Sequence, residues 1–151
     1  MSGIQLTKEQ MIQEYMSDSE QNLNCSLHNI SGGFFKPAIN RAYYCALDAI
    51  NACLTTIDIL DHKNHGFVIG KFREHFIKTH VFEVTISDNL GELFDLRQDS
   101  DYSKGFYVGE EEAKELAEKA TVIYETISSY ITDYLIKLSA ANDKFGTVDG
   151  R

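Results

Sequence analysis

The stretch that decides the fold is EEEAKELAEKATVIYETISSYITDYLIKL, residues 110–138. Its apolar residues recur at alternating spacings of three and four, which is typical of a long helix packed lengthwise on other helices. The first three glutamates place negative charge where a helix N-terminus favours it. We therefore predict a helix that begins at Glu110. Its buried stripe comprises Ala113, Leu116, Ala117, Ala120, Ile123, Tyr124, Ile127, Tyr130, Ile131, Tyr134, Leu135 and Leu138.

One helix is predicted before the first glycine pair, Gly32-Gly33, and a second helix after it. Thr7 and Gln10 have the spacing of a capping box, which predicts a first helix over about 8–28. The sequence Ser31-Gly32-Gly33 breaks this helix, and Pro37 can open the next one because its missing N–H costs nothing there. The second helix has a broad face of unusually small residues. Its predicted buried positions are Ala38, Ala42, Cys45, Ala46, Ala49, Ile50, Cys53, Leu54 and Ile57.

The middle of the chain predicts two shorter helices. A third helix covers about 67–79, although its apolar positions follow a less regular phase. Ser87 or Asp88 caps a fourth helix, which the polar run 97–102 weakens or ends. Short connections between five amphipathic helices favour antiparallel neighbours. We predict an all-α fold, an antiparallel up-and-down bundle of four to five helices.

Composition agrees with one globular domain. Hydrophobic residues make up 43% and charged residues 25% of 151 residues, which allows a packed core. We expect the bundle to cover residues 1–142. The polar, glycine-containing residues 143–151 are expected to form a flexible C-terminal tail.

Charge and segment patterns restrict the partners. A net charge of −9 argues against nonspecific binding of duplex DNA, whose affinity comes from basic residues, although a local patch could still hold RNA. No segment has the pattern of a signal peptide or a membrane span, so we expect a cytoplasmic location. Cys25, Cys45 and Cys53 form no CxxC pair, and we expect buried reduced thiols.

Common catalytic and metal-binding motifs are absent from the sequence. It contains no GxGxxG, GxxxxGK[ST], GxSxG, HExxH or CxxC. His62, His65, His75 and His80 could suggest a metal site, but no cysteine or carboxylate cluster completes it. We favour surface or loop-anchoring roles for these histidines, and expect neither a metal nor a cofactor.

The segment around Arg97 concentrates polar chemistry after an apolar helical run. Arg97 is followed by Gln98, Asp99, Asp101 and Tyr102. Because an unpaired buried charge is costly, one hypothesis is a structural Arg–Asp network. The other is a cleft that binds phosphate or RNA, since a planar guanidinium suits bidentate phosphate binding.

The second helix carries further candidate residues. Tyr43 and Tyr44 lie within its apolar pattern, and we expect both to pack in the core. A further hypothesis is that Arg41 reaches toward the Arg97 segment in the folded bundle.

Four sequence blocks together resemble the HEPN domains (higher eukaryotes and prokaryotes nucleotide-binding). They keep the family's order and spacing over about residues 35–130. The resemblance implies a four- to five-helix up-and-down bundle, in agreement with the periodicity. The blocks are Asn40-Arg41-Ala42-Tyr43-Tyr44 with Ala46, Ala49 and Ile50 after it, Asn64 to Ile69, Phe72 to Lys78, and Leu96 to Tyr102.

The resemblance also implies an activity and a departure from it. Many family members are metal-independent endoribonucleases that act as dimers, often as toxins neutralised by a small nucleotidyltransferase. Their motif is an arginine, a polar residue and a histidine four to six residues beyond the arginine. Arg97 and Gln98 match, but Tyr102 stands where the histidine is often found, and no histidine follows Arg97. The segment resembles a branch that reads Arg-Gln, two residues, Asp-Tyr.

This departure bears on the predicted site, which comprises Arg97, Asp101 and Tyr102. RNA cleavage needs a group that transfers a proton, and Asp101 could serve as base but would also repel phosphate. We therefore expect weak or absent cleavage. Arg73 with His80 has the motif's spacing in another helix, and we interpret it as coincidence.

Three functional hypotheses follow. The favoured one is a HEPN subunit of a prokaryotic toxin–antitoxin or defence module, which binds RNA or a nucleotide in the cleft of a homodimer formed around the Arg97 helix. One alternative is an inert module that binds without cutting. Another is a structural partner whose acidic face docks a minimal nucleotidyltransferase. Whether Tyr102 is a target for nucleotidylation is left open.

Overall fold

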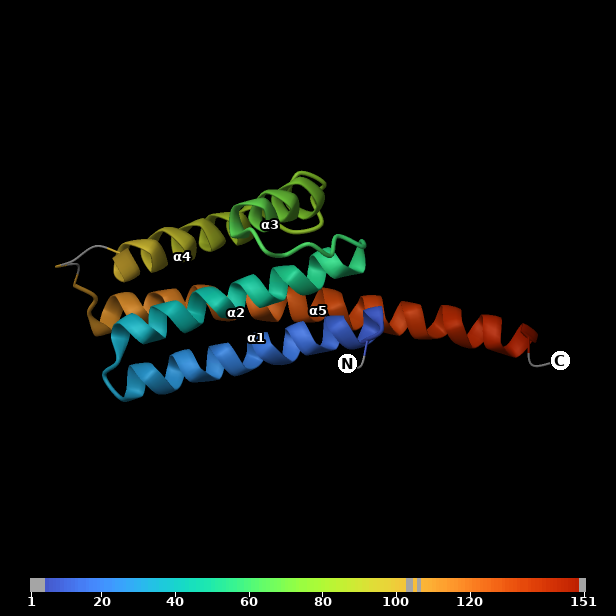
Figure 1. The fold of residues 1–151 in the computed structure, drawn as a ribbon, viewed down its shortest axis with the longest axis horizontal. Coiled ribbons are helices and arrows are strands. Elements are labelled where there is room, and N and C mark those ends of the chain that lie inside the picture. The colour runs from blue at the N-terminus through green and yellow to red at the C-terminus, as the bar shows by residue number, and fades with distance from the viewer. Residues whose placement is uncertain (1–4, 103–104, 106, 150–151) are drawn as a thin grey trace.

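The computed structural model describes residues 5–102, 105 and 107–149, apart from the side chains of residues 102 and 144–149. Within these ranges it contains α-helices, one π-helical turn and no strand (Figure 1). The predicted all-α fold is confirmed. The elements are α1 (Lys8–Ser31), α2 (Phe35–Thr56), α3 (His65–Phe72), η1 (Arg73–Ile77), α4 (Val84–Tyr102) and α5 (Glu110–Asp149).

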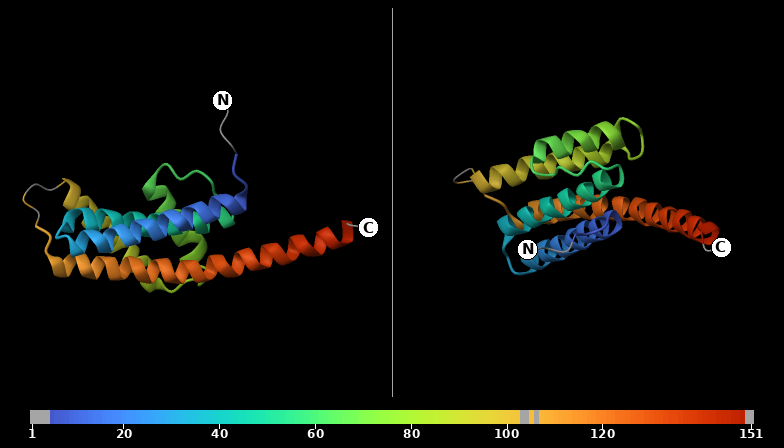
Figure 2. Two further views of the ribbon diagram at one scale, coloured as in Figure 1. Left: turned by 90° about the horizontal axis from the view of Figure 1, so that it is seen from below. Right: turned by 45° about the vertical axis from the view of Figure 1, so that its right-hand side comes forward.

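The long helices run up and down in turn, and α2 lies at the centre. α1 packs on one side of α2, and α3 and α4 lie on the other (Figures 1 and 2). α2 contacts α1, α3, α4 and α5. The small residues of α2, such as Ala42 and Ala46, are fully buried and allow its neighbours to approach closely.

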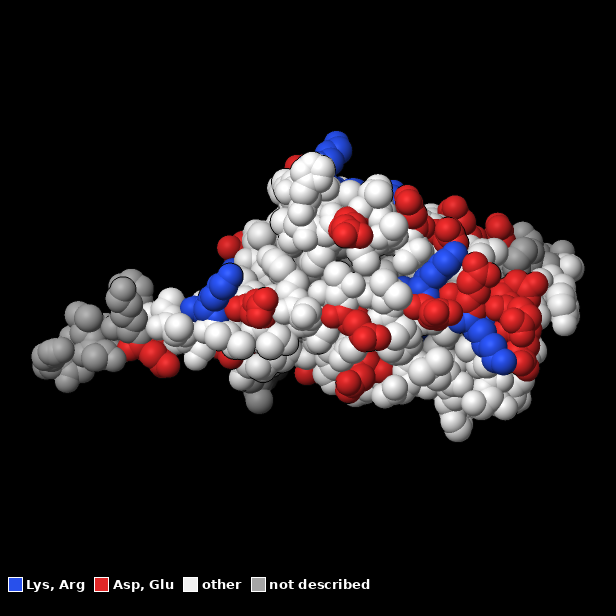
Figure 3. Space-filling model, turned by 180° about the vertical axis from the view of Figure 1, so that it is seen from behind, with Lys and Arg blue, Asp and Glu red and all other residues white. Residues whose placement is uncertain are grey.

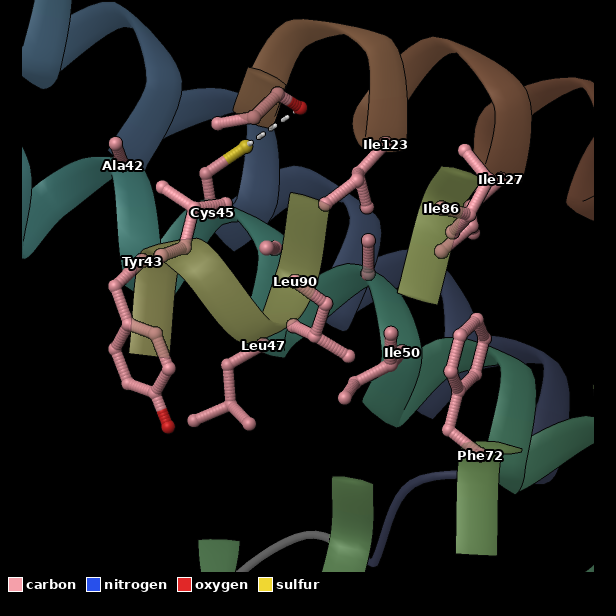
Figure 4. Close-up of a cluster of buried hydrophobic side chains, with 14 of the residues drawn as sticks. Ala42, Tyr43, Cys45, Leu47, Ile50, Phe72, Ile86, Leu90, Ile123 and Ile127 are labelled. Atoms are coloured by element: carbon pink, nitrogen blue, oxygen red, sulfur yellow. Dashed lines mark hydrogen bonds between the residues drawn. The ribbon is translucent and has the colours of Figure 1, made fainter. Parts of the chain in front are cut away.

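The predicted stripe of α5 supplies one wall of the core. Leu116, Ala120, Ile123, Ile127 and Ile131 are at most 4% exposed. Figure 4 shows two of them, Ile123 and Ile127, facing residues of α2, α3 and α4. Burial of each leucine or isoleucine side chain contributes roughly 1.5–3 kcal/mol. The C-terminal part of α5 projects past the bundle (Figure 2).

The start of α1 follows the capping box predicted from the sequence. The backbone N–H of Gln10 donates to Thr7 Oγ1 (3.1 Å), and the N–H of Thr7 donates to Gln10 Oε1 (2.9 Å). Pro37 lies in the first turn of α2, where its missing N–H is harmless. Ile57 was predicted to be buried, but it is 39% exposed. It lies just after the end of α2, where fewer neighbours cover it.

The irregular phase of the third helical segment has a structural cause. α3 passes directly into the π-helical turn η1, in which the N–H of Lys78 donates to Arg73 O (2.9 Å). The wider turn shifts the apolar face relative to α-helical spacing. Phe72 and Phe76 thereby point to the same side, and their rings stack with that of Phe82.

The fourth helix corrects two predictions. It begins at Val84, and Ser87 is buried within it instead of capping it. It also continues through the polar run to Tyr102. Arg97 and Asp101 stand one turn apart and form an ion pair, which supports the helical conformation. Ser100 is buried on the same turn.

Three further predictions concern the cysteines, the C-terminus and membrane spans. Cys45 and Cys53 are buried, but Cys25 is exposed, which corrects its assignment to the core. α5 is helical to Asp149, into the segment expected to be a flexible tail, and the mobility of that segment stays a prediction. Among the described residues, no helix has the length and hydropathy needed to cross a bilayer.

Candidate functional site

Arg97 projects from α4 onto two tyrosine rings of α2. Its Cζ lies 5.4 Å from the ring centroid of Tyr43 and 5.5 Å from that of Tyr44. Nη2 donates a hydrogen bond to the Tyr44 hydroxyl (3.2 Å). The side chain is 16% exposed, so the aromatic rings and the hydroxyl hold most of the guanidinium away from water.

Asp101 provides the counter-charge to Arg97. Its Oδ2 lies 3.0 Å from Arg97 Nε, so the Arg–Asp pair of the structural-network hypothesis is present. The Nε–H is not directed at the carboxylate, however, and it has no hydrogen-bond partner among the described residues. The contact is therefore an ion pair without an aligned hydrogen bond, and a better-placed acceptor could replace Asp101.

Arg41 lies about one turn before Tyr44 on α2 and contacts the ring of Tyr44. Its Cζ lies 5.1 Å from the Tyr44 ring centroid. Its Nη1 donates to Asn22 Oδ1 (2.8 Å), and its Nη2 donates to Asn40 Oδ1 (2.6 Å). The two guanidinium groups thus lie against one ring, and Arg41 lines the same pocket as Ser100 and Asp101.

Tyr43 links this polar group to the core. It is fully buried, as predicted, and Figure 4 shows its hydroxyl pointing away from the apolar cluster. The oxygen lies 3.0 Å from His65 Nδ1. Burial raises the pKa of Tyr43 to about 12, so the phenol stays protonated near neutral pH. Tyr44 is only half-buried, which corrects its predicted place in the core.

His65 is a site residue that the sequence did not reveal. It begins α3, and the side chain of Asn64 caps this helix by accepting from the N–H of Phe67 (2.9 Å). The imidazole is half-buried, with its centroid 5.8 Å from that of Tyr43 and 5.9 Å from that of Tyr44. Burial lowers the pKa of His65, and the positive charge of Arg97 lowers it further. The imidazole is therefore neutral at pH 7.

We call Arg41, Tyr43, Tyr44, His65, Arg97 and Asp101 the Arg97 cluster. A pocket of about 460 Å³ adjoins the cluster where α1 ends, α2 begins and α4 ends. Lys36 and Arg41 bring positive charge to it, and the Oγ of Ser100 is buried without a hydrogen-bond partner among the described residues. These groups suit a ligand with phosphate and hydroxyl oxygens. The full lining is Cys25, Asn29, Lys36, Pro37, Asn40, Arg41, Ser100 and Asp101.

Tyr102, the third residue of the predicted site, is the last residue of α4. Its side chain lies outside the described residues, so its role stays a prediction. Of the three predicted residues, the structure brings Arg97 and Asp101 together.

Two further histidines, His62 and His80, lie outside the Arg97 cluster. His62 lies 2.8 Å from the Tyr15 hydroxyl and 2.7 Å from Ile59 O, so it anchors the loop after α2 as expected. Arg73 donates to Ser87 Oγ (2.8 Å), whereas His80 is exposed. Within the described ranges, no group of three or more His, Cys, Asp or Glu side chains could hold a metal.

Comparison with known proteins places this geometry in a family. The HEPN domain model matches residues 12–130, which include every member of the Arg97 cluster. The chain belongs to the HEPN family. This confirms the resemblance identified from the sequence blocks.

Two relatives of this HEPN chain come from Methanocaldococcus jannaschii. The protein named "Putative toxin MJ0142" is 26% identical over 140 residues, which cover 93% of this chain and 94% of that protein. The protein named "Putative toxin MJ0605" is 26% identical over 124 residues, which cover 82% of this chain and 91% of that protein. Both alignments span most of each chain, so this HEPN chain is similar over most of its length to two proteins that are named as toxins.

Proposed function

We propose that this HEPN chain is the toxin-type subunit of a toxin–antitoxin or defence module, and that it binds RNA or a nucleotide at the Arg97 cluster. The observation that carries the proposal is the meeting of two guanidinium groups, from Arg41 and Arg97, at the ring of Tyr44. Guanidinium groups bind phosphate oxygens, and a half-exposed aromatic ring can stack on a base.

The charge distribution supports a local site. The chain as a whole carries a net charge of −9 and would repel a polyanion. The pocket beside the cluster is lined by two cations, Lys36 and Arg41, and by one carboxylate, Asp101. Because Asp101 is already paired with Arg97, an incoming phosphate competes with it for the guanidinium. Binding should therefore be specific to this site and weakened by salt.

The proposal includes a homodimer with the cleft between two copies and α4 at the interface. The cluster lies where α4 ends, and the polar side chains Asp95, Gln98 and Asp99 of α4 are exposed. A second copy could cover this side by a symmetric contact. Light scattering at tens of micromolar, roughly the range of a weak interface, should show a dimer. A monomer throughout that range would contradict this part of the proposal.

RNA binding can be tested by fluorescence anisotropy with a labelled single-stranded RNA. We expect Arg97→Ala or Arg41→Ala to weaken binding at least about tenfold, since a charge-assisted hydrogen bond contributes roughly 1.5–3 kcal/mol. Arg73→Ala is the matched control, because Arg73 is also half-buried but bonds Ser87 away from the cluster. Equal binding by all three variants would favour the structural-network hypothesis. Thermal melts of each variant exclude unfolding as the cause.

A second candidate function, docking of a minimal nucleotidyltransferase, is favoured by an acidic surface. Figure 3 shows acidic side chains gathered at the end of the bundle where α5 begins. Glu111→Lys with Glu118→Lys should weaken such a complex in co-purification, and Arg97→Ala should leave it intact. The exposed acidic residues there are Glu110, Glu111, Glu112, Glu115 and Glu118.

A further inference from the structure

We propose that His65 is the general base of an RNA-cleaving reaction at the Arg97 cluster. The inference rests on the proposed binding of RNA at this cluster and adds a chemical step to it. It replaces the weak or absent cleavage expected from the sequence, where no histidine follows Arg97. Cleavage through the ribose 2′-hydroxyl needs a proton acceptor and a cation near the same phosphate. His65 and Arg97 come from different helices, yet both lie against the rings of Tyr43 and Tyr44.

The hydrogen bonding of His65 leaves one ring nitrogen, Nε2, able to accept a proton. Nδ1 faces the Tyr43 hydroxyl at 3.0 Å, and Nε2 has no hydrogen-bond partner among the described residues. In the tautomer that can act as a base, Nδ1–H donates to the Tyr43 oxygen and Nε2 presents a lone pair. The same Nδ1–H bond persists after Nε2 takes up a proton. Tyr43 is therefore a positioning residue, which fixes the ring while its own proton stays in place.

The surroundings keep the base form populated. Tyr43 and Tyr44 from α2 contact the His65 ring, and the charge of Arg97 from α4 acts on it. Arg73 of η1 and Asp95 of α4 line a pocket with the adjacent residue Gly66. Burial and Arg97 both lower the pKa of His65, so its lone pair is available at pH 7. This arrangement differs from a surface histidine such as His80, which no neighbouring helix covers.

The proposed step balances without a metal or an external oxidant. His65 Nε2 takes the proton of the 2′-hydroxyl, and O2′ forms a bond to the adjacent phosphorus. The bond between phosphorus and O5′ breaks, and O5′ receives the proton from Nε2 directly or through water. The products are a 2′,3′-cyclic phosphate and a 5′-hydroxyl. The Arg97 guanidinium stabilises the extra negative charge on the phosphoryl oxygens in the transition state.

The test uses the full chain and end-labelled single-stranded RNA, with EDTA present. We expect cleavage to give a cyclic phosphate end, and no product from an RNA with 2′-deoxyribose at the cleavage site. His65→Gln should lower the rate at least about 100-fold, the usual contribution of general acid–base catalysis, while RNA affinity stays within about threefold. The matched control is His80→Asn, which should cleave like the native chain.

The pH profile separates a catalytic role from a structural one. The native rate should rise with pH through a pKa below the usual histidine value and then level off, because only neutral His65 accepts a proton. Tyr43→Phe removes only a hydroxyl from the buried ring, so it should keep the fold, lower the rate and move this midpoint. It provides a second variant if His65→Gln fails to fold.

The outcomes distinguish the two proposals. Native protein that binds RNA without cleaving it overturns the role of His65 and leaves the proposed binding function standing. Native protein that does not bind RNA overturns both. Cleavage that survives in both His65→Gln and Tyr43→Phe, with the same pH profile, assigns the base to another group and also overturns the inference.

Discussion

The two ends of the bundle use aromatic side chains in opposite ways. At the end formed by η1 and the start of α4, the rings of Phe72, Phe76 and Phe82 stack at 5.5–5.9 Å, with Tyr130 edge-on to two of them. At the other end, Tyr43 and Tyr44 contact guanidinium groups and an imidazole. The first arrangement excludes water and contributes stability. The second holds polar groups ready for a ligand and retains a pocket beside them.

The largest expected effect is at the phenylalanine end. Phe76→Ala should lower the free energy of unfolding by about 3–5 kcal/mol, because Phe76 is 2% exposed and its loss leaves a cavity. Urea denaturation followed by circular dichroism measures the change. RNA affinity of the folded fraction should be unaltered. A loss below 1 kcal/mol would show that this end is not the stabilising one. Ile136→Ala, at a 62% exposed position, is the control.

A smaller effect on stability is expected at the Arg97 end. Tyr44→Phe keeps the ring but removes the hydroxyl that accepts from Arg97, so the free energy of unfolding should fall by only about 1 kcal/mol. RNA binding should weaken, because Arg97 loses one of the contacts that fix it. If Tyr44→Phe instead destabilises the chain as much as Phe76→Ala, the contrast between the two ends disappears.

A pH-dependent effect is expected beside the Arg97 cluster, at Asp48 of α2. Asp48 bonds Asn22, which also accepts from Arg41. Burial raises the pKa of Asp48 to about 6, above its ordinary value of 3.8. The folded state therefore binds the proton more tightly, and the contribution of Asp48 to stability is lost as pH rises from about 4 through 6.

The variant Asp48→Asn measures this contribution. It should melt a few degrees higher than the native chain at pH 8, and the difference should vanish at pH 4, where Asp48 is protonated in the native fold. Comparison of the two proteins cancels the opposite contribution of His65, whose lowered pKa destabilises the fold in acid. Equal differences in melting temperature at both pH values would contradict the raised pKa of Asp48.

The sequence predicted best where one pattern repeats many times. The α5 stripe from Leu116 to Ile131 is buried as expected, because every turn carries the same apolar signal. The predicted end of α4 was wrong, because the polar residues there resemble a loop when they are read in isolation. Its helix is supported by the Arg97–Asp101 pair and by burial of Ser100, which depend on neighbouring helices. Local propensity does not contain that information.

The site was predictable only in part for the same reason. Arg97 and Asp101 are close in sequence, so their pairing could be anticipated. His65 reaches the cluster through the packing of α3 on α2, and no spacing rule connects it to Arg97. The signal that could have found it is the block from Asn64 to Ile69, which already formed part of the HEPN resemblance.

The burial of α2 has a consequence for the entropy of binding. Of its 22 residues, 15 are buried, and the same helix carries Arg41, Tyr43 and Tyr44. Backbone atoms enclosed on so many sides have little freedom left to lose when a ligand arrives. The two tyrosines and Arg41 therefore move together as one preorganised unit. Differences in affinity between ligands should then reflect the contacts each makes, because the cost of ordering this helix was met during folding.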